Sequence, residues 1–118
     1  MDLLELTAAS LARVIRERKA SAREAVDAHL ARIERHDARI GAFLHVDAEG
    51  ARRAADAIDR RLAAGEEAGP LAGVPVAVKD NLAVLGMPCT CASRILQAYR
   101  PPYAAHVVEK LQAAGAIV

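Results

Sequence analysis

The spacing of apolar residues changes abruptly after residue 65. Up to that point apolar residues recur every three or four positions, which is the period of amphipathic helices. Residues 71–78 (Leu-Ala-Gly-Val-Pro-Val-Ala-Val) form an almost unbroken apolar run instead. Such a run, with β-branched residues, is typical of a strand buried on both faces of a parallel or mixed sheet. The sequence therefore predicts helices first and the beginning of a sheet afterwards.

Three helices are predicted before this change of pattern. The first follows Thr7, a suitable N-cap. The second begins at the capping-box sequence of residues 21–24 (Ser-Ala-Arg-Glu) and ends near Gly41. A short strand over residues 42–46 is predicted next, and the third helix follows over residues 47–65.

Charged residues on the third helix predict ion pairs along its exposed face. Glu49 precedes Arg53 by four positions, and Asp56 precedes Arg60 by four. Side chains at this spacing are neighbours on a helix surface.

After the apolar run, a helix from about Ala104 to Gly115 and a new strand over residues 116–118 are predicted. A strand, a helix and a second strand form a parallel crossover unit, and a buried strand needs neighbours on both sides. Since the chain offers only about three strand candidates, it is expected to be the N-terminal part of a larger protein. We predict an α/β fold with a mixed sheet covered by helices. Residues 1–65 would be a helical region, and residues 66–118 the start of a core sheet that is cut short at the C-terminus.

Composition excludes several classes of function. Sixteen basic and fifteen acidic side chains leave a formal net charge of +1, so no electrostatic field favours direct binding of nucleic acid or of an anionic membrane. Aromatic residues are 3% of the chain and tryptophan is absent, which leaves no platform for base stacking. No apolar run approaches the roughly 20 residues that span a bilayer, and the start of the chain lacks the pattern of a signal peptide. A cytoplasmic protein is expected.

Cys89 and Cys91 are one residue apart. This spacing is too short for an unstrained disulfide, and it differs from the Cys-x-x-Cys of zinc and redox sites. We predict that both cysteines are reduced, that Cys91 is a small buried residue, and that no metal site is present. Surface or packing roles are predicted for the four scattered histidines, which are His29, His36, His45 and His106.

Lys79 follows the apolar run directly and precedes Asp80 and Asn81. At the end of a buried strand its amine would lose water, which favours the neutral form that can act as a base. Arginine could not replace it in that role, because a guanidinium stays charged. The alternative is a lysine at the edge of the sheet that pairs with Asp80 or another carboxylate in solvent. Spacing alone leaves both interpretations open.

Residues 76–79 (Val-Ala-Val-Lys) also match the strand of protein kinases whose lysine holds nucleotide phosphates. That interpretation requires a glycine-rich hairpin before the strand, and helices are predicted there instead. The sequence contains neither a P-loop nor a dinucleotide-binding fingerprint. No cofactor is therefore predicted to bind this chain.

Three segments carry a family resemblance: Leu71–Asn81, which reads Gly-x-Pro-x-x-x-Lys-Asp-Asn at its core, Gly86–Leu96, and Pro101–Leu111. With these motifs the chain resembles the amidase signature enzymes. Within them it is most similar to the A subunits of the amidotransferases that serve Glu-tRNA(Gln) or Asp-tRNA(Asn). The resemblance is loose over residues 1–65 and close from Leu71 onward.

The resemblance implies a catalytic triad of serine, cis-serine and lysine. One serine attacks the amide carbonyl, and the lysine accepts a proton through the bridging serine. Lys79 matches the family's lysine. Both serines belong to a glycine- and serine-rich segment further along, outside these 118 residues, so the chain alone is expected to be inactive. The serines present are assigned other places: Ser10 inside a helix, Ser21 at a helix cap, and Ser93 at the start of a short helix.

Two further expectations concern neighbouring residues. Asp80 and Asn81 are expected to turn the chain after the strand and to hold the lysine by hydrogen bonds. Residues 104–106 (Ala-Ala-His) depart from the family pattern, because they lack its usual acidic N-cap before the last helix.

The implied function is hydrolysis of glutamine, with the ammonia passed on to convert Glu-tRNA(Gln) to Gln-tRNA(Gln), or Asp-tRNA(Asn) to Asn-tRNA(Asn). The implied partners are the B and C subunits of the amidotransferase. ATP and magnesium belong to the partner's half of the reaction, and the tRNA is reached through the complex. Two alternatives stay open. One is a hydrolytic amidase of the same superfamily. The other is a non-catalytic interaction module that docks through residues 1–65.

Overall fold

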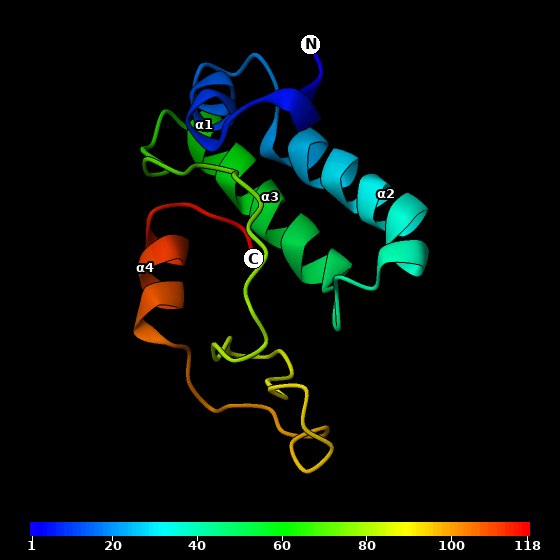
Figure 1. The fold of residues 1–118 in the computed structure, drawn as a ribbon. Helices are drawn as coiled ribbons and strands as arrows, with labels where there is room; N and C mark the ends of the chain where they lie inside the picture. The colour runs from blue at the N-terminus through cyan, green and yellow to red at the C-terminus, as the bar shows by residue number, and fades with distance from the viewer.

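A computed structural model describes all of residues 1–118 (Figure 1). Helices fill the first half of the chain, and most of the second half is irregular. Figure 1 shows α2 and α3 side by side, while the irregular segment extends away from them and returns through α4. The elements are the 3-10 helix η1 (Leu3–Glu5) and the α-helices α1 (Ala8–Arg16), α2 (Ala22–Ile40), α3 (Ala48–Ala63) and α4 (His106–Ala113).

Capping contacts confirm the predicted starts of the first two helices. The Thr7 hydroxyl accepts a hydrogen bond from the backbone N–H of Ser10 at 3.2 Å. At the start of α2, the backbone N–H of Glu24 donates to Ser21 Oγ at 3.0 Å, and the backbone N–H of Ser21 donates to the Glu24 carboxylate at 2.8 Å. The helix ends at Gly41, whose φ of 66° is the left-handed conformation that glycine adopts most readily.

The start of α2 is also held by a residue far along the chain. The backbone N–H groups of Ala22 and Arg23 donate to the two carboxylate oxygens of Asp59, at 2.7 and 3.0 Å. Asp59 belongs to α3, so one helix supplies acceptors for the unpaired N–H groups of the other. A negative charge there is also favourable, because a helix N-terminus carries a partial positive charge.

The ion pairs predicted along α3, Glu49 with Arg53 and Asp56 with Arg60, are wrong. Arg23 and Arg52 each pair instead with one carboxylate on their own helix and with one on the neighbouring helix. The observed pairs are Arg23 with Asp27 and Asp56, and Arg52 with Asp27 and Glu49.

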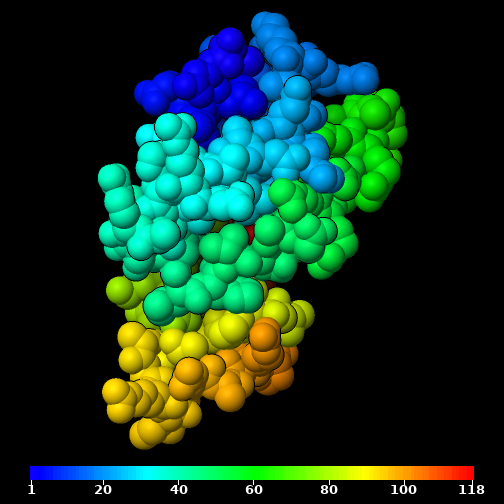
Figure 2. All heavy atoms as spheres, turned by 90° about the vertical axis from the view of Figure 1, so that its right-hand side faces the viewer, coloured from blue at the N-terminus to red at the C-terminus, as the bar shows by residue number.

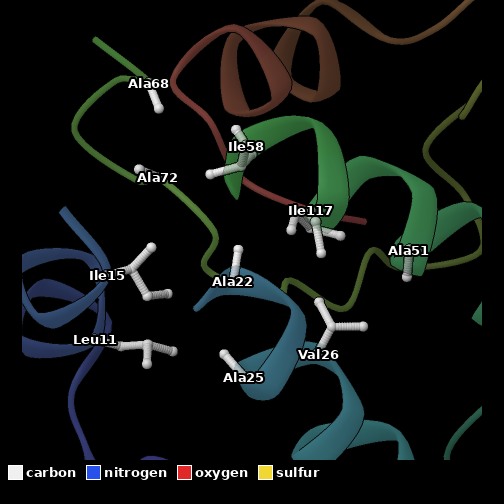
Figure 3. Packing of buried hydrophobic residues seen from close by; sticks show 11 residues of the cluster. Leu11, Ile15, Ala22, Ala25, Val26, Ala51, Ile58, Ala68, Ala72 and Ile117 are labelled. Carbon is white, nitrogen blue, oxygen red and sulfur yellow. The ribbon is translucent and has the colours of Figure 1, made fainter. Parts of the chain in front are cut away.

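Figure 3 shows the buried cluster that joins the helices to the rest of the chain. Ile15 and Val26 are almost completely buried, and full burial of such side chains stabilises a fold by about 1.5–3 kcal/mol each. Ile117, from the other end of the chain, packs into the same cluster between α2 and α3. The members are Leu11, Ile15, Ala22, Ala25, Val26, Ala51, Ala55, Ile58, Ala68, Ala72 and Ile117.

The strand predicted over residues 42–46 does not form. The Asp37 carboxylate instead accepts hydrogen bonds from the backbone N–H groups of Ala42, at 2.7 Å, and Phe43, at 3.3 Å. The backbone after α2 is thus tied to the last turns of that helix. No neighbouring segment pairs with it, and an apolar alternation alone does not make a strand.

The mixed sheet was also a wrong prediction. Residues 70–73 are turns, and the run that follows makes a single parallel bridge, between Pro75 and Ile117. Its hydrogen bonds join Val76 N–H to the Ile117 carbonyl at 2.7 Å and Ile117 N–H to the Val74 carbonyl at 2.9 Å. The parallel direction agrees with the predicted crossover unit. Pro75 has no N–H to donate, and the chain supplies one neighbour where a buried strand needs two, so the ladder goes no further.

Gly73 of the Gly-x-Pro motif is required by packing. Its φ is +75°, and a Cβ built on it would lie 2.7 Å from the Ala22 Cβ and 2.9 Å from the Ile15 Cδ1. Both conditions exclude a larger side chain. This glycine therefore allows the backbone before Lys79 to lie directly on α1 and the start of α2.

The last helix, α4, begins at His106, and its N-cap residue Ala105 makes no side-chain capping bond, as the missing acidic cap predicted. Gly115 follows the helix with a φ of 93°. The short helix predicted to begin at Ser93 is absent, since residues 94–98 form only a bend and turns. No helix in the structure combines the length and apolar character needed to cross a membrane.

Candidate functional site

A groove of about 1230 Å³ separates the helical layer from the segment that carries Lys79. One wall is the second half of α2 with the loop after it, and the other is formed by residues between 75 and 92. Ile117 and Val118 also line the groove. Figure 2 looks onto the side where these two layers meet, with the helices in cyan and green and the facing segment in yellow. Most lining residues are apolar. Lys79, the residue of the predicted site, is among those that line the groove.

Lys79 lines this groove and is exposed. The burial expected at the end of a central strand is therefore not found in this chain, because the pairing with Ile117 stops at Val76 and no segment pairs with residues 77–79. The expected hydrogen bonds from Asp80 and Asn81 to the lysine are also wrong, and so is the alternative pairing with a carboxylate: no hydrogen bond or ion pair involves Nζ. The amine is directed by its backbone alone.

Asp80 and Asn81 do turn the chain, as predicted. The backbone N–H of Leu82 donates to the Lys79 carbonyl at 3.0 Å, which closes a four-residue turn with Asp80 and Asn81 at its centre. The Asp80 carboxylate bonds Thr90 instead of the lysine, with the backbone N–H at 2.9 Å and the Thr90 hydroxyl as donors. The Thr90 hydroxyl is the largest cause that lowers the pKa of Asp80.

The two cysteines differ in exposure, and the environment predicted for Cys91 is wrong. Cys89 is buried, and burial raises the pKa of its thiol. Cys91, predicted to be buried, is exposed and lines the groove with Lys79. Cys91 and Ala92 form a turn with φ values of 51° and 55°, a region that residues other than glycine rarely adopt.

No hydroxyl group faces Lys79 across the groove. The lining residues include no serine, threonine or tyrosine. Ser10 lies inside α1, as predicted, and its hydroxyl accepts from Thr7. Ser21 caps α2, as predicted. By itself the groove can therefore place an amine beside an apolar surface, but it has no hydroxyl for attack on a carbonyl.

Sequence reasoning treated the histidines as scattered, yet His29, His36 and His45 line the same groove. The Nδ1 of His29 is 2.7 Å from the Ala25 carbonyl. A helical spacing of seven residues, from 29 to 36, could have revealed the shared face of the first two. The structure has no group of three or more metal-ligating side chains. The sequence also contains no signal for the contact between Thr90 and Asp80.

The geometry places an exposed lysine, shortly after a Gly-x-Pro segment, in the lining of a mostly apolar groove. The model of the Amidase family matches residues 24–118. The chain therefore belongs to the Amidase family.

Particular relatives narrow this assignment. The A subunit of the glutamyl-tRNA(Gln) amidotransferase of Salinispora arenicola is 55% identical over 117 residues, which are 99% of this chain and 24% of that protein. The corresponding A subunit of Streptomyces coelicolor is 46% identical over the same shares. Native peptide amidase from Stenotrophomonas maltophilia has a similar structure, with a TM-score of 0.90 and 31% identity over 97% of this chain and 24% of its own. The chain thus spans about a quarter of the length of these relatives.

Proposed function

We propose that residues 1–118 are the Lys79-bearing part of the glutaminase subunit of a tRNA-dependent amidotransferase. The observation that carries the proposal is the 55% identity to the A subunit of a glutamyl-tRNA(Gln) amidotransferase, maintained over 99% of the chain. The Gly-x-Pro-x-x-x-Lys-Asp-Asn segment lies within the matched residues, and its lysine lines the groove between the helical layer and residues 75–92.

In this proposal Lys79 is the proton acceptor for amide hydrolysis. A serine in the rest of the protein attacks the glutamine amide carbon, and its proton passes through a second serine to the neutral amine of Lys79. As the C–N bond of the tetrahedral intermediate breaks, the relay returns the proton to the leaving nitrogen, which departs as ammonia. Water then hydrolyses the acyl-enzyme and releases glutamate. If the rest of the protein covers the groove, water is removed from the amine, and its neutral form is favoured.

The ammonia then serves amidation of Glu-tRNA(Gln), or of Asp-tRNA(Asn), in a complex with the B and C subunits. ATP and magnesium act in the partner's half of the reaction. The balanced charge of this chain, +1 over 118 residues, suits a subunit that meets tRNA through its partners instead of by its own surface. A tRNA-dependent reaction of this kind belongs in the cytoplasm.

The test uses a full-length subunit in which residues 1–118 replace the matching segment of the Salinispora arenicola protein. Lys79→Ala and Lys79→Arg should both reduce glutamine hydrolysis by about 100-fold to 10,000-fold, since neither side chain can accept a proton. The matched control is Lys110→Arg on the exposed surface of α4, which should leave the rate unchanged. Near-full activity of the Lys79→Arg variant would show that the lysine acts by charge alone.

The 118-residue chain without the rest of the protein should hydrolyse no glutamine, because the attacking serine is assigned elsewhere. Hydrolysis by the short chain that disappears with Ser93→Ala would contradict this assignment.

A hydrolytic amidase is the second candidate, and the fold shared with peptide amidase favours it. The two functions differ in substrate and partners. Recovery of the B and C subunits with the chimeric protein, together with ammonia transfer to Glu-tRNA(Gln), supports the amidotransferase. Hydrolysis of peptide amides without partner subunits supports the amidase.

A further inference from the structure

The backbone just after Lys79 is tied to a segment ten residues further along. The carboxylate of Asp80 accepts the backbone N–H of Thr90 at 2.9 Å and also the Thr90 hydroxyl. The carbonyl of Asp80 accepts the backbone N–H of Cys91 at 2.9 Å. We call the contacts between residues 80 and 90–91 the Asp80–Thr90 clasp. It closes a loop that begins at the residue next to Lys79.

The clasp holds backbone that would not adopt its conformation alone. Cys91 and Ala92 have φ values of 51° and 55°, a region that residues other than glycine rarely enter and that costs free energy. Thr90 bonds this segment: its hydroxyl accepts the Ala92 N–H at 3.1 Å, and its carbonyl accepts the Ser93 N–H at 2.8 Å. Strain of this kind persists only where neighbouring contacts fix it.

The strained residues and the lysine face the same space. Lys79, Asp80, Cys91 and Ala92 all line the groove, although residues 79 and 91 are twelve positions apart. Nothing bonds the Lys79 amine itself, so its position depends on where the backbone of the turn is held.

We propose that Asp80 and Thr90 are positioning residues for Lys79, which act by fixing the turn from which its amine enters the groove. This inference rests on the proposed function, because it assigns the clasp to the reaction that Lys79 serves. Neither residue touches the reacting atoms. A carboxylate suits the task because its two oxygens can take both donors of one threonine.

The first test asks whether the clasp exists, and it needs no activity. Cys89 is 7% exposed and its thiol lies 3.7 Å from the Asp80 carbonyl, whereas Cys91 is exposed. In the 118-residue chain, the rate of alkylation of Cys89 relative to Cys91, measured by mass spectrometry, reports opening of the loop. Thr90→Val keeps the shape of the side chain but removes the hydroxyl, and it should raise this ratio about tenfold or more. Thr90→Ser should leave it within about twofold, because the hydroxyl is kept.

Thr7→Val is the matched control. Thr7 is the only other threonine of the chain, and its hydroxyl caps α1, away from the loop. This variant loses stability like Thr90→Val, but the alkylation ratio should stay unchanged. An equal rise in both variants would mean that Cys89 reports general unfolding, and the clasp would be rejected.

The second test asks whether the clasp serves the reaction, in the full-length chimeric protein. Thr90→Val should lower kcat for glutamine about 10- to 100-fold with KM within about twofold, as for a group that acts in the transition state alone, and Thr90→Ser should restore kcat. If Thr90→Val raised the alkylation ratio but left kcat unchanged, the positioning role would be overturned and the proposed function would stand. A raised KM with unchanged kcat would assign the clasp to substrate binding instead. Full activity of Lys79→Ala would reject the proposed function itself, whatever the alkylation ratios show.

Discussion

Residues 1–65 and residues 66–118 obtain their structure in different ways. The helices of the first region are closed by contacts over three or four positions, such as the Ser21–Glu24 capping box. The second region is held by contacts across many residues, such as the hydrogen bond from Gly73 N–H to the Gly115 carbonyl. Local bonds form as soon as a few residues are fixed, whereas distant pairing must first overcome the entropy of closing a loop. A short chain can complete the first kind and only begin the second.

The largest expected difference between the regions is in the free energy of unfolding lost when an isoleucine is shortened to alanine in each of them. Ile15 is 1% exposed in the shared cluster, whereas Ile95 is 94% exposed in the second region. Ile15→Ala should reduce the free energy of unfolding by about 2–5 kcal/mol. Ile95→Ala should change it by less than about 0.5 kcal/mol. Urea unfolding followed by circular dichroism measures both. Similar losses in the two variants would mean that the second region packs as tightly as the first.

A smaller effect tests how far the first region is held by distant contacts of its own. Asp59 on α3 supplies both acceptors at the start of α2. Asp59→Ala should cost about 0.5–2 kcal/mol, the usual value of a lost helix cap. Glu34→Ala, on the exposed face of α2, removes the same charge without a capping bond and should change stability by less than about 0.5 kcal/mol. Equal losses would attribute the effect of Asp59 to net charge.

These contrasts explain what the sequence could and could not predict. Thr7 and Ser21 predict the starts of two helices, because a capping side chain and the N–H group that it bonds are only three residues apart in the chain. The capping role of Asp59 could not be predicted in this way, since its partners lie 36 and 37 residues away. Pro75 and the turns over residues 70–73 interrupt the long apolar run. The hydrophobicity of this run does not show how many neighbouring strands are available to pair with it.

The candidate site divides in the same way. Lys79 was found because it ends a motif that is continuous in the sequence. Thr90 was missed because it acts on Asp80 across ten positions, and no periodicity links them. Lys79 is exposed because no neighbouring segment covers residues 77–79. The sequence of the Lys79 segment itself could not predict this.

The smallest effect is the dependence of stability on pH, and it too separates the regions. In the helical region, hydrogen bonds from Arg52 and then Arg23 lower the pKa of Asp27 below its ordinary value of 3.8. The bonded form is the charged one, so its contribution is complete well above the ordinary pKa. It is lost as the pH falls through the still lower pKa of the folded state. The melting temperature should therefore be flat from pH 7 to about 5 on this account and should fall below about 4.

Asp27→Asn isolates this contribution, because an amide does not titrate. The variant should melt below the parent at pH 7 and approach it at about pH 3. Asp80, whose pKa is lowered chiefly by the Thr90 hydroxyl, should respond differently. The Asp80→Asn variant should alter the protection of Cys89 more than the melting temperature, because its bonds fix a loop and not the helical layer. If Asp80→Asn lowered the melting temperature as much as Asp27→Asn, the loop would be part of the cooperative core, and the contrast between the two regions would be wrong.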